Sequence, residues 1–316
     1  MVRILVIHYS QTGQLTRVLR AMIEPLEADP GVRVDWHEAR PQRDYPFPWS
    51  LLSFLDAFPE SVYLDPPAMQ PGGLDADTPY DLVILGYQVW FLSPSLPVTG
   101  FLKSPQARVL RGRRVITVVG CRGMWARAYH AMLGLLRDAG ARLVDNVVLT
   151  DQGPLWSTFI TTPWWMLTGN KGPLLGLFPE AGISAQEIRR AARFGRALRE
   201  ALPRLAASES GPFLAGLEAV HVNRLILTSE RIVHRSFRLW GALVRAAGRP
   251  GSAARKPVLL LYGCFLVGAI LTVVPFTVSF AAIAARFSRR IRDEAAVLER
   301  PSGSGSDRLV QFDVGG

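Results

Sequence analysis

The stretch Ile4-Leu-Val-Ile-His-Tyr9-Ser10-Gln11-Thr12-Gly13-Gln14-Leu15-Thr16 decides the fold, because an apolar run passes directly into hydroxyl residues and a glycine. The pattern predicts a buried strand, a tight loop and a helix N-terminus. Hydroxyls and free amides at such a terminus bind an anion such as phosphate. The spacing matches neither Gly-x-Gly-x-x-Gly nor Gly-Lys-Ser/Thr, which favours a mononucleotide. An ordinary strand-to-helix turn remains the alternative.

Strand and helix patterns alternate through the first 210 residues. Runs typical of strands are Arg3–His8, Val32–His37, Leu82–Gly86, Val115–Gly120 and Ala141–Thr150. Helical patterns are Leu15–Ala28, Leu96–Leu102, Trp125–Ala139 and Ser184–Leu202. The alternation predicts an α/β fold with a doubly wound, five-stranded parallel sheet. In such sheets the ligand binds beyond the carboxyl ends of the strands, so the loops after the first, third and fourth strands should converge.

Two of these loops carry aromatic residues that a flat heterocycle could contact. The third-strand loop runs from Gly86 to Pro97 and includes Trp90 and Phe91, while Gly120–Trp125 follows the fourth strand. Aromatic side chains in loops are often simply packed, so each loop alone is weak support for a ligand site. Three such loops at one edge of the sheet favour a bound cofactor.

Residues 3–206 resemble the flavodoxin-like FMN proteins. The pattern at Ser10–Leu15 looks like their phosphate loop, and Trp90–Pro97 followed by Gly100-Phe101-Leu102 resembles the isoalloxazine loop of their quinone-reductase branch. The resemblance implies FMN as the cofactor. The residues expected to bind it are Ser10, Gln11, Thr12, Gly13, Gln14, Leu15, Tyr87, Gln88, Val89, Trp90, Phe91, Leu92, Cys121, Arg122, Gly123, Met124 and Trp125.

The whole chain resembles a narrower group, the flavodoxin-like protein of dialkylresorcinol and aryl-polyene pathways. That group is often labelled a dialkylresorcinol condensing enzyme, yet condensation needs a nucleophilic Cys with His partners in a thiolase-type fold. The resemblance instead implies an FMN-dependent oxidoreductase that aromatises a lipidic dialkylcyclohexanedione to a resorcinol. His130 is the candidate general base, with Asp56, Glu60 and Asp151 as rivals. The alternatives are an NAD(P)H:quinone oxidoreductase and a membrane-tethered electron carrier or scaffold.

Two segments exceed what a minimal flavodoxin needs. Residues 40–80 are rich in proline and aromatics, and residues 151–183 carry Trp156, Trp164 and Trp165. Long segments of this kind inside a compact domain are usually functional or locally ordered. We expect them to wall an apolar pocket over the flavin, or alternatively to cover exposed sheet edges.

The C-terminal third carries the membrane signals. Residues 211–256 contain eight Lys or Arg against two Asp or Glu, and residues 257–285 contain no charged residue. An amphipathic helix at 229–245 precedes this run, which is longer than the roughly 20 residues that span a bilayer. Basic residues flank both ends, so a single span and a bent monotopic insertion both remain open. The expected location is the cytoplasmic face of the inner membrane, with an anionic lipid surface and a lipidic dione or quinone as partners.

The remaining expectations concern what the sequence lacks. The excess positive charge precedes the apolar run and has no nucleic-acid-binding motif around it, which argues against nucleic acid as a partner. The cysteines Cys121 and Cys264 lie far apart and predict neither a disulfide framework nor a metal site. Residues 299–316, rich in Ser and Gly, are expected to form a disordered tail. A homodimer is left open.

Overall fold

Five parallel strands form the central sheet of the computed structural model, in the order β2-β1-β3-β5-β6. The structure describes residues 1–313, with the side chains of Leu155, Leu175 and residues 273–287 left out of the description. The strands are β1 (Val2–His8), β2 (Val32–Glu38), β3 (Leu82–Trp90), β5 (Arg114–Cys121) and β6 (Arg142–Thr150). A two-residue strand, β4 (Ser93–Pro94), pairs antiparallel with the end of β3. The predicted α/β class and parallel sheet are confirmed.

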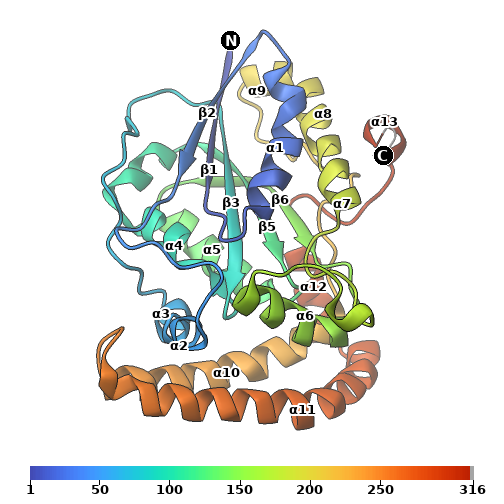
Figure 1. The fold of residues 1–316 in the computed structure, drawn as a ribbon. Coiled ribbons are helices and arrows are strands. Elements are labelled where there is room, and N and C mark those ends of the chain that lie inside the picture. The colour runs from blue at the N-terminus through green and yellow to red at the C-terminus, as the bar shows by residue number, and fades with distance from the viewer. Residues whose placement is uncertain (314–316) are drawn as a thin grey trace.

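Helices cover both faces of the sheet (Figure 1). One face carries α1 (Gln14–Glu27), α7 (Ala185–Arg190), α8 (Ala192–Glu200) and α9 (Leu202–Ala206). The other face carries α4 (Leu96–Lys103), the 3-10 helix η1 (Pro105–Leu110) and α5 (Ala126–Asp138). Residues Ile4–Ile7 of β1 are fully buried, as expected for a parallel strand covered on both faces.

The two insertions form helices at the carboxyl edge of the sheet. The first contains α2 (Leu51–Asp56) and α3 (Phe58–Tyr63), and the second contains α6 (Leu155–Thr168) and the 3-10 helix η2 (Leu174–Gly176). Both insertions therefore lie where a ligand binds in this class of fold (Figure 1).

A helical hairpin lies beneath the same edge. It consists of α10 (Arg224–Ala247), the short η3 (Ala253–Arg255) and α11 (Lys256–Phe287), followed by α12 (Arg289–Leu298) and α13 (Leu309–Phe312). In Figure 1, α10 and α11 lie side by side across the bottom of the molecule. The predicted amphipathic helix 229–245 lies within α10, and the apolar run lies within α11.

A second apolar core joins the hairpin to the first insertion. Its buried members are Leu55, Phe58, Val62, Leu92, Phe237, Val244, Leu259 and Tyr262. The rings of Phe58 and Tyr262 stack with centroids 4.1 Å apart. The hairpin is therefore packed on the domain through Leu259 and Tyr262 at the start of the apolar run.

The structure differs from the predicted domain boundary at residue 210. Phe213, Leu214 and Leu217 are buried in the main core together with the sheet, and the amide of Val148 in the edge strand β6 donates to the Ala219 carbonyl. An edge strand has a row of backbone groups without a partner strand. Residues 213–219 cover part of this row on β6.

The structure also differs from the predicted disordered tail. Ser302 is buried, accepts from the Asn146 amide at 2.7 Å and donates to the Asp145 carboxylate at 2.8 Å. Phe312 is buried in the main core. A Ser- and Gly-rich composition favours disorder only when nothing captures the chain, and here a buried carboxylate does. Residues 314–316 of the predicted tail lie outside the described residues.

Candidate functional site

The loop between β1 and α1 has the geometry of an anion cradle. The Ser10 and Thr12 hydroxyls each accept from an amide in the first turn of α1, both at 3.4 Å. Gly13 has φ +73° and faces open space, since a Cβ there would meet nothing within 4 Å. Among the described residues, no acceptor pairs with the amides of Thr12, Gly13 and Leu15. Unpaired amides at a helix N-terminus attract an anion.

The loops after β1, β3 and β5 meet at one edge, as predicted. The Gln11 amide donates to the Gln88 side-chain carbonyl at 3.1 Å, which joins the first loop to the end of β3. At the end of β5, a Cβ on Gly120 would touch Leu15 and Ile183. Gly120 therefore lies within van der Waals reach of Leu15 at the start of α1 and of Ile183 in the second insertion.

Trp90 lies at the centre of an aromatic cluster formed with the first insertion. Its ring meets those of Tyr9, Tyr45 and Trp49 edge to face, with centroids 5.9, 4.9 and 5.5 Å away. The Gln11 side chain donates to the backbone carbonyl of Tyr45 at 3.1 Å and so connects the first insertion to the loop between β1 and α1. Trp90 and Tyr45 therefore connect the anion cradle to the insertion.

Several predicted cofactor-binding side chains point away from this edge. Tyr87 is fully buried in the main core, and burial raises the pKa of its phenol well above the usual range. Trp125 is also buried and packs on Tyr129 in α5. Phe91 and Leu92 enter the second core. These four side chains are therefore engaged in packing against other parts of the chain.

The turn from β3 to β4 explains where Phe91 and Leu92 go. Both residues have positive φ, at 48° and 62°, as in a two-residue type I′ hairpin turn. Bulky residues adopt this conformation at a cost of about 1 to 3 kcal/mol each unless the surroundings hold them. The second core holds both side chains, so the strain is located directly beside the predicted site.

Arg122 supplies a cation at the fourth-strand loop. Its guanidinium lies 4.0 Å from the Phe159 ring of α6, and one of its nitrogens lies 3.5 Å from the Met124 sulfur. Loss of hydration lowers its pKa to about 10. Within the described part of the chain, no salt bridge includes Arg122. Burial raises the pKa of the adjacent Cys121 thiol to about 12, so this cysteine stays protonated.

Gln14 binds the second insertion instead of pointing into the loop. Its side chain donates to the Ile183 carbonyl at 3.0 Å and accepts from the Ile183 amide at 3.1 Å. Asp151 accepts from the amides of Gly153 and Gly182, which fixes the same segment. These contacts place α6 over the ends of β5 and β6, and assign Asp151 a structural task.

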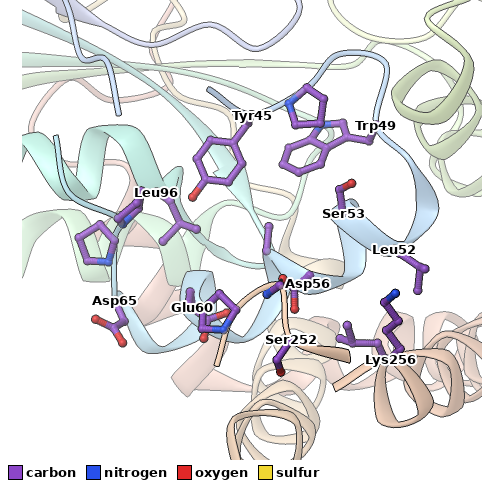
Figure 2. A pocket seen from close by; sticks show the side chains of 17 residues that line it. Tyr45, Trp49, Leu52, Ser53, Asp56, Glu60, Asp65, Leu96, Ser252 and Lys256 are labelled. Carbon is purple, nitrogen blue, oxygen red and sulfur yellow. The ribbon is translucent and has the colours of Figure 1, made fainter. Parts of the chain in front are cut away.

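A cavity of about 490 Å³ lies between the first insertion and the hairpin (Figure 2). Tyr45 and Trp49 line one side, Asp56 and Glu60 lie opposite, and Lys256 stands at the hairpin side. Of the predicted cofactor-binding residues none lines it, but Tyr45 and Trp49 also contact Trp90. The first insertion thus walls a pocket beside the loops, whereas residues 151–183 are absent from its lining.

An ion-pair cluster supports the floor of this cavity. Arg255 is fully buried and pairs with Asp56 at 3.2 Å and with Glu60 at 2.9 Å. The amide of Gly251 donates to Asp56 at 2.7 Å. Desolvation raises the pKa of Glu60 even though Arg255 opposes the shift. Asp56 and Glu60, two of the three rivals to His130 as a base, are therefore engaged in holding the start of α11 on the insertion.

His130 is half-buried on α5, on the side that faces α10. Burial lowers its pKa, and the charges of Arg127 and Arg231 lower it further, so the imidazole is neutral near pH 7. No described contact joins His130 to the three loops. Its task as a general base stays a prediction.

Glu230 is a feature that the sequence reasoning missed. This buried carboxylate of α10 accepts from the amides of Ala126 and Arg127 at 3.2 and 2.9 Å, and so caps the N-terminus of α5. Burial raises its pKa to about 7, against the lowering effect of these hydrogen bonds. The sequence feature that could have identified this cap is a single Glu on the apolar side of the predicted helix 229–245.

The strand order defines the class of the fold. Counting the parallel strands along the chain, the order is 2-1-3-4-5, which is that of flavodoxin-like proteins, with the site at the switch point beside the first strand. Among the described residues, no group of three or more His, Cys, Asp and Glu is arranged to hold a metal ion.

Comparison with solved structures gives flavoproteins at low identity. A flavoprotein from Lactobacillus acidophilus in complex with FMN is 17% identical over 47% of this chain and 93% of its own, with a TM-score of 0.37. General stress protein 14 from Treponema denticola, also in complex with FMN, is 11% identical over 66% of this chain and 99% of its own (TM-score 0.32).

A third similar structure is an apo NADH:FMN oxidoreductase. It is 14% identical over 48% of this chain and 76% of its own, with a TM-score of 0.32. TM-scores below 0.5 carry no inference about function. The strand order therefore remains the basis for assigning the fold class. No family model matches the sequence, and no curated protein does.

Proposed function

We propose that this protein is an FMN-dependent oxidoreductase. The observation that carries the proposal is the meeting of an anion cradle, an aromatic cluster and an unpaired cation at the switch point of a flavodoxin-like sheet. Each of these features matches one part of a flavin mononucleotide. They lie at the carboxyl ends of the neighbouring strands β1, β3 and β5, which is where ligands bind in this class of sheet.

The first loop fits the phosphate. Its three unpaired amides and two hydroxyls are donors that a dianion accepts, and the open space at Gly13 lets the phosphate approach the backbone. Arg122 follows β5, with β3 between it and this loop, and its partly desolvated guanidinium without a carboxylate partner supports binding of a part of the ligand that carries or gains negative charge. The chain therefore contains a donor set suited to FMN.

The substrate that we propose is a lipidic dialkylcyclohexanedione, which the enzyme converts to a dialkylresorcinol. The substrate loses a proton next to a carbonyl and a hydride from the neighbouring carbon, and the resulting enone tautomerises to the aromatic ring. FMN, when bound, supplies the two-electron oxidant for this change. The largely apolar cavity beside Tyr45 and Trp49 supports a greasy substrate, and its size is typical of small-molecule sites.

Cofactor binding is tested by comparing FMN with riboflavin. Purified protein should show the absorbance of bound flavin, and Thr12→Val should weaken FMN binding by about tenfold or more because a hydrogen bond to a charged group is lost. Riboflavin lacks the phosphate, so its affinity should be the same for Thr12→Val and the unchanged protein. Colourless protein that takes up neither flavin contradicts the proposal and favours a scaffold.

The reaction is tested by anaerobic titration of the flavin-loaded protein. Bleaching of the flavin absorbance by a dialkylcyclohexanedione, with inertness toward NADPH, supports the aromatase. Rapid bleaching by NADPH followed by recovery with a quinone favours the NAD(P)H:quinone oxidoreductase. That alternative retains the cofactor site and overturns only the substrate.

A further inference from the structure

The apolar helix α11 has both of its ends on the same domain. At its start, Leu259 and Tyr262 are buried in the second core, and Arg255 just before it is fully buried with Asp56 and Glu60. Directly after it, Ile291 of α12 is buried in the main core. The chain therefore leaves the domain at the start of α11 and returns to the same domain directly after it.

The length of α11 makes this return incompatible with a span. Its 32 residues extend for about 48 Å, which exceeds the roughly 30 Å of a hydrocarbon core. A span would carry α12 to the far side of the bilayer. There it would lose the ion pair between Arg231 of α10 and Glu294, together with the burial of its apolar face.

The hairpin nevertheless presents an apolar face to solvent. Between Ala253 and Thr272 the helix is long and apolar enough to cross a membrane, yet only 17% of its most apolar window is buried. Leu261, Val267 and Leu271 are 61%, 57% and 71% exposed. Neighbouring α10 adds Leu239 and Leu243, which are 64% and 49% exposed. Such a paired apolar surface is larger than scattered exposed side chains explain.

Exposed cations surround this face. They are Arg235, Arg249, Lys256, Arg289, Arg290 and Arg292, and none of them forms a salt bridge with a described residue. An apolar face bordered by arginine and lysine fits the boundary between acyl chains and anionic headgroups. A soluble protein partner would instead be expected to supply matching carboxylates.

We infer that α10 and α11 lie flat in one leaflet of an anionic membrane as a monotopic anchor, with both ends of α11 on the side of the domain. This inference is independent of the cofactor. It places the carboxyl edge of the sheet against the bilayer, and the cavity edge at the exposed Lys256 at the membrane surface.

Cysteine labelling separates the flat arrangement from a span. In a Cys264→Ser background, Lys256→Cys and Arg290→Cys place a thiol before and after the apolar run, and both positions are exposed. In inverted inner-membrane vesicles, a membrane-impermeant maleimide should label both to the same extent without detergent. Labelling of one position only after detergent overturns the inference. The remaining Cys121 reacts weakly because its thiol is protonated.

Vesicle binding tests the lipid partner. The unchanged protein should cosediment with vesicles of neutral lipid plus phosphatidylglycerol, and Arg289→Glu/Arg290→Glu should bind at least tenfold more weakly, since each cation near an anionic surface contributes about fivefold. Arg108→Glu/Arg111→Glu is the matched control, because both arginines are exposed and lie just before β5 at the opposite edge of the sheet. Equal binding of both variants contradicts the inference.

The apolar contribution is tested with Leu261→Asp, for which Val310→Asp is the control at a 92% exposed position on α13. Leu261→Asp should lose vesicle binding, and Val310→Asp should retain it. A dimer that Leu261→Asp converts to monomer, without vesicle binding by the unchanged protein, shows that a second copy covers the face and overturns the inference.

Discussion

At the scale of single residues, the proposed site combines free donors with unpaired charge. The amides of Thr12, Gly13 and Leu15 and the guanidinium of Arg122 have no carboxylate among the described residues to satisfy them. By contrast, the Glu230 carboxylate accepts hydrogen bonds from the amides at the N-terminus of α5, so these amides are not available to a ligand. The anion cradle is therefore restricted to the loop before α1.

Glu230 gives a prediction about pH. Its pKa is raised from an ordinary value near 4.5 to about 7, so the folded state binds a proton more tightly than the unfolded state does between these values. This group consequently lowers the free energy of unfolding as pH rises from about 5 to about 7, and no further above that. Glu230→Gln should remove its part of the slope.

Urea unfolding of the unchanged protein and of Glu230→Gln at pH 5, 6, 7 and 8 measures the effect. Asp145 also titrates in this range, with a pKa raised to about 6 by burial, so the difference between the two curves is the relevant quantity. Parallel curves across the whole range would show that Glu230 does not titrate there.

At the scale of elements, close helix packing depends on one glycine. A Cβ at Gly195 in α8 would lie 1.9 Å from the Met22 carbonyl oxygen of α1, which is a backbone atom and cannot swing aside. The two helices form much of the layer that covers β1 and β3. Their separation would loosen the α1 N-terminus that carries the anion cradle.

Gly195→Ala should therefore lower the free energy of unfolding by about 2 to 3 kcal/mol, as overpacking does in a tight core. Gly134→Ala in α5 is the matched control, because a Cβ there meets nothing within 4 Å. Alanine in that helix should be neutral or stabilise by up to about 1 kcal/mol. Equal effects of the two substitutions, measured by urea unfolding, would contradict the packing argument.

At the scale of the whole molecule, the C-terminal residues close the edge of the sheet. Ser302 bridges Asp145 and the Asn146 amide in β6, and Asp145 also accepts from the amides of Phe213 and Leu214. Two segments distant in sequence thus share one buried carboxylate. The chain leaves the domain through the helical hairpin, and the hydrogen bonds of Ser302 hold it at β6 where it packs on the domain again.

Ser302→Ala should lower the free energy of unfolding by about 1 to 3 kcal/mol, because a buried amide and a carboxylate oxygen lose a partner. The exposed Ser304→Ala provides the control and should have no measurable effect. If thermal or urea unfolding gave no change for either variant, the tail would contribute nothing to stability, as its composition alone suggested.

Much of the sheet and part of the site follow from sequence patterns. Five apolar runs predict the strands, and the Ser10–Leu15 loop and Trp90 are recognisable by composition and spacing. The directions of the Phe91 and Leu92 side chains cannot be predicted from the sequence, because they depend on a turn with positive φ at two bulky residues. The cavity is equally hidden, since its lining joins residues 45–67 to residues 250–259.

The sequence by itself determined the alternation of strands and helices, the loop suited to phosphate and the uncharged run of residues 257–285, because each is a local pattern. Only the tertiary structure decided that Glu230 caps α5, that Ser302 is captured by Asp145 and that both ends of the apolar run return to one domain. These outcomes depend on burial between segments far apart in the chain. Periodicity reports which face of an element is apolar, whereas packing selects the surface that covers it.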